Sequence, residues 1–408
     1  MGELIRLKWK GSELTPKPIF LPLSKSINNR LLIMRALSGG KVDIEGESSA
    51  EDVQYLKRAI HSDSPELYMG DGGTAIRFGL AWAAITPGVR TITGSERLMQ
   101  RPIADLVDDL NRIGADIEYT EKKGFAPLVV KGKELRGGEL APRGNTSSQF
   151  ISALLLIAPY CREGLVLNLS SDQVSLPYIS ITVALLKLAG ADVNESENQI
   201  RVAPGGYKPC SIAVEPDWSG ASYFYAWQAL ARFPKIELAA LDNHSIQGDR
   251  NGVKPFRDFG VTEDFEPSSL VLKPGKRNLP SEINFLDSPD LAQTFAACAA
   301  GLRHRLKLTG LQTLRVKETD RIAALQAELA KCGVTCQSGA DFIALTAFEP
   351  PQGIPRIKTY RDHRMAMAFA PLVIQLGEIE IEDPDVVAKS FPNYWEEVAK
   401  LGVEITKI

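Results

Sequence analysis

The sequence is poor in the residues that mark metal sites and disulfide frameworks. Its 408 residues include only four histidines and five cysteines. They form no HExxH or CxxC motif and no Cys/His cluster at ligand spacing, so metal chemistry has little support. An odd number of cysteines without a paired motif is typical of free thiols in a reducing compartment.

Long hydrophobic runs and an excess of positive charge are also missing. No uninterrupted apolar run approaches the roughly 20 residues of a membrane-spanning helix. The N-terminal "MGELIRLKWKGSEL" lacks the apolar core of a signal peptide. The formal net charge of −3 gives no reason to expect a nucleic-acid partner. We therefore expect a cytoplasmic protein that binds neither membranes nor nucleic acid.

The common signatures of nucleotide loops and serine nucleophiles are absent or weak. The sequence contains no GxxxxGK[ST] phosphate loop and no GxSxG elbow. The segment "GDGGTA", from Gly70, fits the loose form of a dinucleotide loop. However, the strand before it is short, and the acid Glu96 lies further on than the ~20 residues that such a loop requires. No cofactor is predicted.

What the sequence does contain is a recurring pattern of a helix, a glycine and an alternating strand. These glycines are Gly114, Gly190, Gly260, Gly333 and Gly402, at intervals of 76, 70, 73 and 69 residues. Glycine is favoured there because a residue that ends a helix often takes a left-handed conformation. The near-constant interval predicts tandem α/β units. The segment "EDVQYLKRAIHSDSPELYMG" resembles a sixth copy whose strand is cut short.

Six units and 408 residues together predict two domains of three units each. The seam should lie near "VEPDWSGASYF", Val214 to Phe224, where Pro, Gly and Ser interrupt an apolar pattern before a new helix. If the N-terminal strand "LIRLKW" belongs to the second cluster, the chain crosses between the domains twice. The predicted domains are therefore 22–215 and 1–21 with 216–408.

Three segments rich in Gly, Ser and Thr each run directly into an apolar helix. They are "LSKSINNRLLIMRAL", "GDGGTAIRFGLAWAAI" and "GNTSSQFISALLLIAP", the last beginning at Gly144. The N-terminus of a helix offers unpaired N–H groups and a favourable dipole to an anion, although helix capping alone would also explain such segments. The cations in or beside them, Lys25, Arg30, Arg77 and Arg143, favour phosphate or carboxylate ligands.

The second half of the chain carries further cations at helix starts or after strands. A charged run, "LRVKETDRI", precedes the amphipathic "AALQAELAKCGV", and a solvated first turn with local ion pairs would explain it. The apolar "MAMAFAPLVI" after Arg364 instead predicts burial of that cation. Asp290 and Glu318 lie among these cations, and an enzyme that acts on anions needs both charges and proton carriers. The cations are Arg101, Arg315, Lys317, Arg321, Arg364 and Lys389.

The motifs, taken in order, resemble the 5-enolpyruvylshikimate-3-phosphate (EPSP) synthase family. They are "LSKSINNR", "GDGGTAIRF", "RPIADLVDDL", "SSQFISALL", "SLPYISIT", "RVKETDRI", "DHRMAMAFA" and "KSFPNYW". The pair "RVKETDR" and "DHRMAM" is highly specific, and the resemblance covers nearly the whole chain from about Ser24. It implies an α/β fold of two domains, each of three βαβαββ-type units in an inside-out α/β barrel. These domains would close on the substrates in the cleft between them.

The resemblance also implies an activity and its residues. The enzyme would be a 3-phosphoshikimate 1-carboxyvinyltransferase of the shikimate pathway, moving the enolpyruvyl group of phosphoenolpyruvate to the 5-hydroxyl of shikimate 3-phosphate and releasing phosphate. Asp290, Glu318 and Lys25 would be catalytic, with Asp290 beside the 5-hydroxyl and Glu318 near the enolpyruvyl methylene. Shikimate 3-phosphate would contact Lys25, Ser26, Arg30, Ser147, Ser148, Gln149, Ser175, Tyr178 and Lys317. Phosphoenolpyruvate would contact Lys25, Gly73, Arg101, Gln149, Arg321, Arg364 and Lys389.

On this resemblance the lower domain, 22–215, contacts shikimate 3-phosphate, and the second domain completes the phosphoenolpyruvate site. No cofactor is implied, and a monomer is expected. Mutual repulsion of Lys25, Arg101, Arg364 and Lys389 predicts that the free enzyme is open and closes when anions bind.

The sequence departs from the family pattern at a few positions. Asp71 stands where the family usually has Asn, and a carboxylate beside a phosphate pocket repels the substrate unless it is protonated or paired, with Arg77 the nearest candidate cation in sequence.

Two other functions remain open at this stage. The related transferase that acts on UDP-N-acetylglucosamine would need a catalytic cysteine in a mobile loop, and no cysteine lies in such a motif. A non-catalytic anion-binding homologue would bind ligand but release no phosphate.

Overall fold

The structure, a computed structural model, describes residues 3–11, 16–143, 147–170 and 174–408. The chain divides into two compact units. We call Leu23–Glu215 the inserted unit, and Met1–Pro22 together with Pro216–Ile408 the split unit. The second boundary coincides with the one expected from the sequence, and the first differs by one residue.

The most regular repeat lies in the split unit and follows the order βαβαββ. Its sheet has the strand order β16-β17-β19-β18. The first two strands are parallel, and the last two form an antiparallel hairpin with the pair β17 and β19 also antiparallel. The elements are β16 (Glu282–Asn284), η3 (Pro289–Leu291), α10 (Ala292–Gly301), β17 (Leu306–Thr309), η4 (Gln312–Val316), α11 (Arg321–Lys331), β18 (Val334–Ser338) and β19 (Ile343–Phe348).

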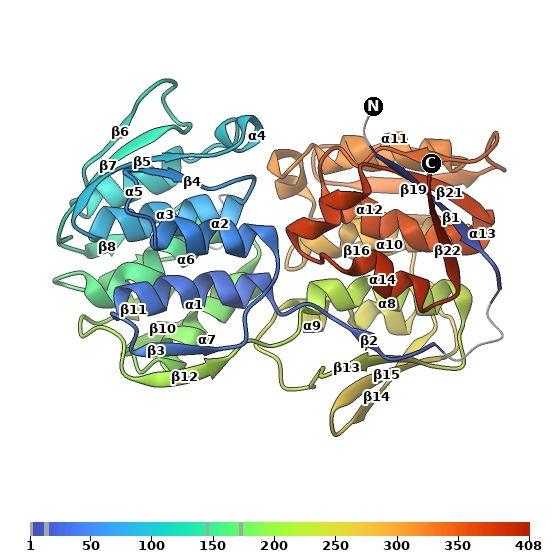
Figure 1. Cartoon of the computed structure of the whole chain (residues 1–408), viewed down its shortest axis with the longest axis horizontal. Coiled ribbons are helices and arrows are strands. Elements are labelled where there is room, and N and C mark those ends of the chain that lie inside the picture. Colours follow the sequence, from blue (N-terminus) through green and yellow to red (C-terminus); the bar gives the residue numbers. More distant parts are fainter. Residues whose placement is uncertain (1–2, 12–15, 144–146, 171–173) are drawn as a thin grey trace. The chain divides into compact units, whose positions relative to one another are not determined.

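The other two sheets of the split unit take in the N-terminal strands. β1 (Leu4–Trp9) lies between β21 and β22 and is antiparallel to both, as Figure 1 shows by its blue colour among red strands. β2 (Ile19–Phe20) pairs in parallel with β13. The expected strand "LIRLKW" therefore completes a sheet of the C-terminal cluster.

The remaining elements of the split unit follow the same plan. They are α8 (Trp218–Ala231), β13 (Ile236–Ala239), α9 (Asp249–Gly252), η2 (Lys254–Arg257), β14 (Val261–Glu266), β15 (Ser269–Pro274), β20 (Arg356–Ile357), α12 (His363–Phe369), η5 (Ala370–Leu372), α13 (Val373–Leu376), β21 (Glu378–Glu382), η6 (Pro384–Lys389), α14 (Tyr394–Ala399) and β22 (Val403–Lys407).

The inserted unit contains two four-stranded sheets and one two-stranded sheet in its described part. The four-stranded sheets have the orders β4-β5-β7-β6 and β10-β11-β9-β8, and the small sheet pairs β3 with β12 in parallel. Its elements are α1 (Lys25–Leu37), β3 (Val42–Glu45), α2 (Glu51–Ile60), β4 (Glu66–Tyr68), α3 (Gly73–Ile85), β5 (Gly88–Thr93), α4 (Glu96–Met99), α5 (Ala104–Arg112), β6 (Ile117–Tyr119), β7 (Leu128–Gly132), β8 (Gly138–Leu140), α6 (Ser148–Ile157), η1 (Ala158–Tyr160), β9 (Leu165–Asn168), α7 (Leu176–Leu188), β10 (Val193–Ser196), β11 (Gln199–Val202) and β12 (Cys210–Ala213).

The small sheet is the degraded repeat that the sequence indicated. It has a first and a second strand, β12 and β3, with α1 packed against β3, but the described residues give it no closing hairpin. The short strand after α2 is β4, and it pairs with β5 of the next sheet. Our assignment of that strand to the degraded repeat was therefore wrong, although the count of six repeats is confirmed.

The five spaced glycines have the backbone that the repeat requires. Their φ angles are 107°, 71°, 86°, 79° and 85° for Gly114, Gly190, Gly260, Gly333 and Gly402, all in the region that favours glycine. At Gly333, a Cβ atom would lie 2.0 Å from the carbonyl oxygen of Glu349. Only glycine therefore fits this turn without displacement.

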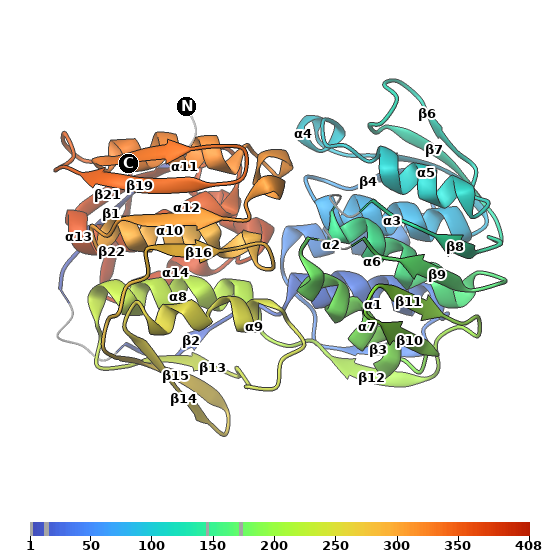
Figure 2. The ribbon, with the colours of Figure 1, turned by 180° about the vertical axis from the view of Figure 1, so that it is seen from behind.

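Helices form the interior of each unit and sheets its outside. In α3, 12 of the 13 residues are buried, and α8 is also apolar almost all round, as expected of a central helix. Strands alternate instead, with buried and exposed residues in β11 and with buried and half-buried residues in β13. Figures 1 and 2 show the helices of each unit flanked by its strands. The arrangement is the predicted inside-out one, but none of the sheets in the described ranges closes into a barrel. None of the helices described is long and apolar enough to cross a membrane.

Candidate active site

A buried arginine at the start of α11 joins three carboxylates of the split unit. Arg321 has a side chain that is only 1% exposed. Its Nη1 lies 2.8 Å from Asp290 Oδ1, its Nη2 lies 2.8 Å from Glu318 Oε2, and its Nε lies 2.7 Å from Asp362 Oδ2. A buried guanidinium is costly unless such partners compensate its charge. Burial by itself would lower the pKa of Arg321, but the three carboxylates raise it above its usual value.

Asp290 forms ion pairs with two further cations. Arg364 Nη2 lies 2.9 Å from its Oδ2, and Lys317 Nζ lies 3.4 Å from its Oδ1. Burial alone would raise the pKa of Asp290, but Arg364, Lys317 and Arg321 outweigh it and hold this pKa well below the usual value. The carboxylate is therefore ionised at neutral pH, and its basicity is suppressed as long as all three cations face it.

Two N-caps fix the positions of these charges. Asp320 accepts a hydrogen bond from the backbone N–H of Ala323 and so starts α11 at Arg321. Asp362 is fully buried and accepts a bond from the N–H of Arg364 at 3.0 Å, which starts α12. Because Asp362 also binds Arg321, one carboxylate aligns the beginnings of both helices.

Lys389 is the last residue of η6 and is 9% exposed. Its ammonium donates a hydrogen bond to the backbone carbonyl of Arg361 at 2.7 Å, directly before Asp362. Arg364 also approaches the hydroxyl of Tyr223 at 3.4 Å, and burial raises the pKa of this tyrosine to about 12. Tyr223 is therefore a neutral hydrogen-bonding partner rather than a proton acceptor at physiological pH.

In the inserted unit, two guanidinium groups meet at the N-terminus of α3. A Cβ atom placed on Gly73 would lie 2.6 Å from Arg101 Nη1 and 2.7 Å from Arg77 Nη1. Arg77 donates to the carbonyl of Gly73 and to Gln149 Oε1, each at 2.9 Å. A helix N-terminus flanked by two guanidinium groups has the donors and the charge that an anion requires, and a side chain at position 73 would collide with both groups.

The start of α6 is tied to the start of α3. Ser147 caps α6 by accepting from the N–H of Gln149. The amide of Gln149 then donates to the hydroxyl of Thr74 at 3.1 Å and accepts from Arg77. Ser148 is the first residue of α6 and is buried. Three of the predicted residues thus lie at the N-terminus of α6, beside the guanidinium groups of Arg77 and Arg101: Ser147, Ser148 and Gln149.

The start of α1 is tied to α6 and α7 by Arg30. This buried side chain donates to the hydroxyls of Thr182 and Ser152 and to the carbonyls of Ser26 and Tyr178, at 2.6–3.2 Å. Burial lowers the pKa of Arg30 to about 9. Four of its five N–H groups donate to other residues in the described part of the chain.

Lys25 and Ser175 complete this part of the site. Lys25 Nζ lies 2.9 Å from Asp52 Oδ2, and both side chains are largely buried. Ser175 is 6% exposed and stands before α7 with a left-handed backbone, φ 57°. Among the residues that the structure describes, the Lys25 ammonium has one carboxylate partner, and an ammonium carries three N–H donors.

The structure therefore brings the predicted residues together in one cluster per unit. The split unit joins Asp290, Lys317, Glu318, Arg321 and Arg364 through ion pairs, with Lys389 at the adjoining backbone. In the inserted unit, Arg30 links α1 to α6, and Gln149 links the start of α6 to the start of α3. The exposed Arg143 pairs with Asp105, and Arg315 pairs with Asp320, so these two follow the local ion-pair interpretation. Gly144, where the third helix entrance begins, lies outside the described residues.

Sequence reasoning missed three carboxylate or hydroxyl partners. Asp52 holds Lys25 from the next helix, 27 residues away, and no local signal marks it. Asp362 was part of a recognised motif, and its place before an apolar helix is a capping signal that could have identified its role. Ser95 donates its hydroxyl hydrogen to Asp71. The sequence did not indicate this hydrogen bond to the unusual aspartate.

The profile of EPSP synthase (3-phosphoshikimate 1-carboxyvinyltransferase) matches residues 20–398. The chain belongs to the EPSP synthase family. Its activity is accordingly that of a 3-phosphoshikimate 1-carboxyvinyltransferase, an enolpyruvyl transfer in the shikimate pathway. A 3-phosphoshikimate 1-carboxyvinyltransferase of Bacteroides fragilis is 44% identical over 391 residues, which cover 95% of each chain. One of Shewanella denitrificans is 33% identical over 418 residues, covering 95% of this chain and 96% of the other.

Solved structures share the fold of this family member. EPSP synthase from Acinetobacter baumannii superimposes with a TM-score of 0.76 at 22% identity, over 99% of this chain and all of the other. The enolpyruvyl transferase NikO from Streptomyces tendae gives the same TM-score at 15% identity, over 100% of this chain and 99% of the other. At such identities the likeness establishes the inside-out α/β architecture alone.

Proposed function

We propose that the two clusters of this EPSP synthase family member bind shikimate 3-phosphate and phosphoenolpyruvate, with Asp290 and Glu318 as the proton carriers. The 5-hydroxyl oxygen bonds to C2 of phosphoenolpyruvate while C3 gains a proton. The tetrahedral adduct then loses phosphate, and C3 gives a proton back as the double bond reforms. The observation that carries the proposal is the single ion-pair network that holds both carboxylates on Arg321.

The network also suggests how Asp290 becomes basic at the right moment. In the ligand-free protein three cations suppress its pKa. When an anionic group of phosphoenolpyruvate binds Arg364, the attraction of this cation for Asp290 weakens, and the basicity of Asp290 rises. Asp290 is then suited to accept the 5-hydroxyl proton, and Glu318 to exchange a proton with C3. Cations stabilise the charge of the departing phosphate, as in other preorganised sites.

Binding roles follow from the two clusters. We propose that the starts of α1, α6 and α7 hold shikimate 3-phosphate through Lys25, Ser26, Arg30 and their neighbours. Gly73 and Arg101 would bind phosphoenolpyruvate together with Arg321, Arg364 and Lys389 of the split unit. This sharing requires the two units to close on the bound anions, which relieves the repulsion among their cations. Small-angle X-ray scattering would contradict closure if both ligands left the radius of gyration unchanged.

The proposed function is tested by phosphate release. Purified protein should release phosphate only when both substrates are present, and omission of either substrate should abolish the signal. Binding of shikimate 3-phosphate is followed separately by calorimetry. A protein that binds this ligand but releases no phosphate would be the non-catalytic anion-binding homologue, and the proposed function would fail.

We further propose that the enzyme is a cytoplasmic monomer without a nucleic-acid or membrane partner. All five cysteines are free, which supports a reducing compartment. Light scattering coupled to size exclusion would measure the mass of the particle directly. A mass of twice the 44.6 kDa of the chain would overturn the monomer.

Replacing Asp71 by asparagine should lower the KM for phosphoenolpyruvate by up to about fivefold, because it removes a negative charge next to an anion site. The amide can still accept the hydroxyl hydrogen of Ser95. The KM for shikimate 3-phosphate should stay unchanged, since its proposed contacts lie on other segments. The control is Ser95→Ala, which removes this hydrogen bond and keeps the charge, and should not lower either KM. Equal KM values in the parent and Asp71→Asn would place position 71 outside the site.

A further inference from the structure

Two successive residues before α12 hold a left-handed backbone. Tyr360 has a φ of 55° and Arg361 a φ of 58°. Neither is glycine, so this conformation costs free energy and persists only where surrounding contacts impose it. The segment leads directly into Asp362, which caps α12 and binds Arg321. Whatever imposes the left-handed turn therefore also sets the position of these groups.

A buried carboxylate from α11 holds this turn. Glu328 is 0% exposed. Its Oε2 accepts a hydrogen bond from the backbone N–H of Lys358 at 2.9 Å, and its Oε1 accepts one from the Tyr360 hydroxyl at 2.7 Å. The Glu328 carboxylate therefore binds the backbone of Lys358 and the side chain of Tyr360, the two residues on either side of Thr359.

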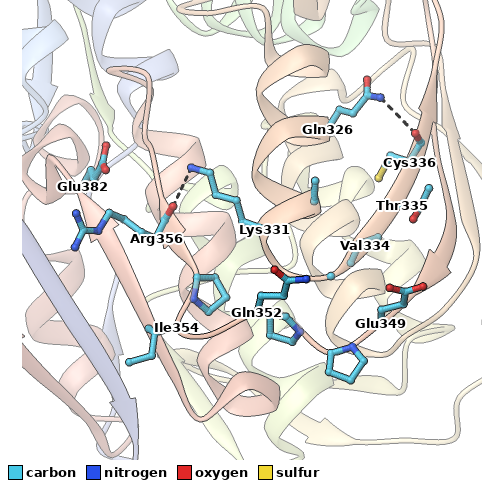
Figure 3. A pocket seen from close by; sticks show the side chains of 15 residues that line it. Gln326, Lys331, Val334, Thr335, Cys336, Glu349, Gln352, Ile354, Arg356 and Glu382 are labelled. Atoms are coloured by element: carbon cyan, nitrogen blue, oxygen red, sulfur yellow. Dashed lines mark hydrogen bonds between the residues drawn. The ribbon is translucent and has the colours of Figure 1, made fainter.

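Lys331 compensates the charge of Glu328 and ties it to β20. Its Nζ lies 2.7 Å from Glu328 Oε2 and donates to the carbonyl of Arg356 at 2.9 Å. Figure 3 shows this second bond beside a cavity of about 700 Å³ that Lys331 and Arg356 help to line. None of the predicted site residues lines that cavity. The carboxylate thus has a fixed counter-ion on the side away from Tyr360.

The helix that carries Glu328 also carries Arg321. Seven residues separate them, which is about two turns, so both side chains lie on the same face of α11. Arg321 holds Asp362, while Glu328 holds Lys358 and Tyr360. One helix face therefore fixes the segment 358–362 at both of its ends.

The turn presents its carbonyl oxygen to a substrate-binding residue. The carbonyl of Arg361 accepts a hydrogen bond from Lys389 Nζ at 2.7 Å. The direction of a carbonyl group follows from the backbone angles around it, so the left-handed pair of Tyr360 and Arg361 aims this acceptor. A change of the turn would redirect the ammonium of Lys389 without removing any charge from the site.

We propose that Glu328 and Tyr360 are positioning residues for the phosphoenolpyruvate end of the site. They hold the left-handed turn whose Arg361 carbonyl orients Lys389. This inference rests on the proposed function, in which Lys389 binds phosphoenolpyruvate. It adds a buried glutamate and a half-buried tyrosine, both outside the proposed substrate contacts, that set the affinity for phosphoenolpyruvate without changing the affinity for shikimate 3-phosphate.

The test uses two variants and a matched control. Glu328→Gln and Tyr360→Phe should each raise the KM for phosphoenolpyruvate by about tenfold, because displacement of a binding group by a fraction of an ångström weakens its contact. The KM for shikimate 3-phosphate should change less than about twofold. The control is Glu397→Gln. Glu397 is also a buried glutamate that accepts a backbone N–H, from Phe20, and pairs with the lysine three residues later, Lys400.

The outcomes separate positioning from general stability. Glu397→Gln should lower the thermal stability of the protein about as much as Glu328→Gln does, but it should leave both KM values unchanged. The inference is overturned if the control shifts the KM for phosphoenolpyruvate as much as Glu328→Gln does, or if Tyr360→Phe is folded and shifts neither KM. Lys389→Met serves as the reference. A raised KM for phosphoenolpyruvate in Lys389→Met without an effect of Tyr360→Phe refutes this inference alone, whereas an unchanged KM in Lys389→Met refutes the proposed role of Lys389.

Discussion

Replacing Asp290 by asparagine is expected to reduce turnover by about 100-fold or more, because the amide keeps the shape of the side chain but cannot accept a proton. The amide oxygen can still accept a hydrogen bond from Arg321, so the KM values should change only a few-fold. The measurement is steady-state phosphate release. The control is Asp287→Asn, which alters an exposed carboxylate three residues earlier, just before η3. An Asp290→Asn variant that turned over at the parent rate would show that another group removes the proton, and Glu318→Gln would then be the next variant to measure.

The same substitution has a predictable effect on stability against pH. The pKa of Asp290 is lowered in the folded protein, so its ionised form favours folding. This contribution is complete above the unfolded pKa of about 4 and is lost as the pH falls through the lower folded pKa. The parent should therefore be more stable than Asp290→Asn at pH 7, and the difference should shrink below about pH 4. Urea unfolding at several pH values measures it.

Replacing Arg321 by glutamine is expected to cost about 3–5 kcal/mol of the free energy of unfolding of the split unit, because breaking a buried ion pair leaves its partners without compensation. Asp362 is fully buried and loses the closest cation that faces it. Activity should fall as well, since Asp290 and Glu318 lose their common anchor. The urea transition can be followed by tryptophan fluorescence, because four of the five tryptophans belong to the split unit: Trp9, Trp218, Trp227 and Trp395.

Arg315 supplies the matched control for this prediction. It lies six residues before Arg321, is 37% exposed and pairs with Asp320 at 2.7 Å. Surface ion pairs contribute roughly 0–1 kcal/mol, so Arg315→Gln should change the unfolding free energy by less than about 1 kcal/mol. If Arg321→Gln were no more destabilising than Arg315→Gln, the buried network would not be a stabilising element.

The repeat and the helix starts could be predicted because they are local properties. A glycine that ends a helix is required by its own φ angle, so the spacing from Gly114 to Gly402 was visible in a single sequence. The cations at helix starts were likewise visible, and Gly73 with Arg101 proved to be adjacent. Their burial depends on residues far away in the sequence. Arg315 and Arg321 therefore looked alike in the sequence, although the Arg315 side chain is 37% exposed and the Arg321 side chain 1%.

What the sequence could not supply was the choice of partner over long separations. Lys25 pairs with Asp52 and Arg321 with Asp362, 27 and 41 residues away. The strand β4 follows α2 but pairs with β5, because strand partners are selected by burial in the finished sheet rather than by the preceding helix. The left-handed turn at Tyr360 was also invisible, since neither residue of the turn is a glycine.

The place of β1 in its sheet has a consequence for biosynthesis. Its two neighbours, β21 and β22, end at Glu382 and Lys407, so β1 pairs with strands that are synthesised after the whole inserted unit. The inserted unit, by contrast, contains all partners of its own strands between Leu23 and Glu215. It can fold while the chain is still growing. β1 lacks both of these neighbours until residues 378–407 have been synthesised, so its sheet in the split unit is completed only after the whole inserted unit has been made.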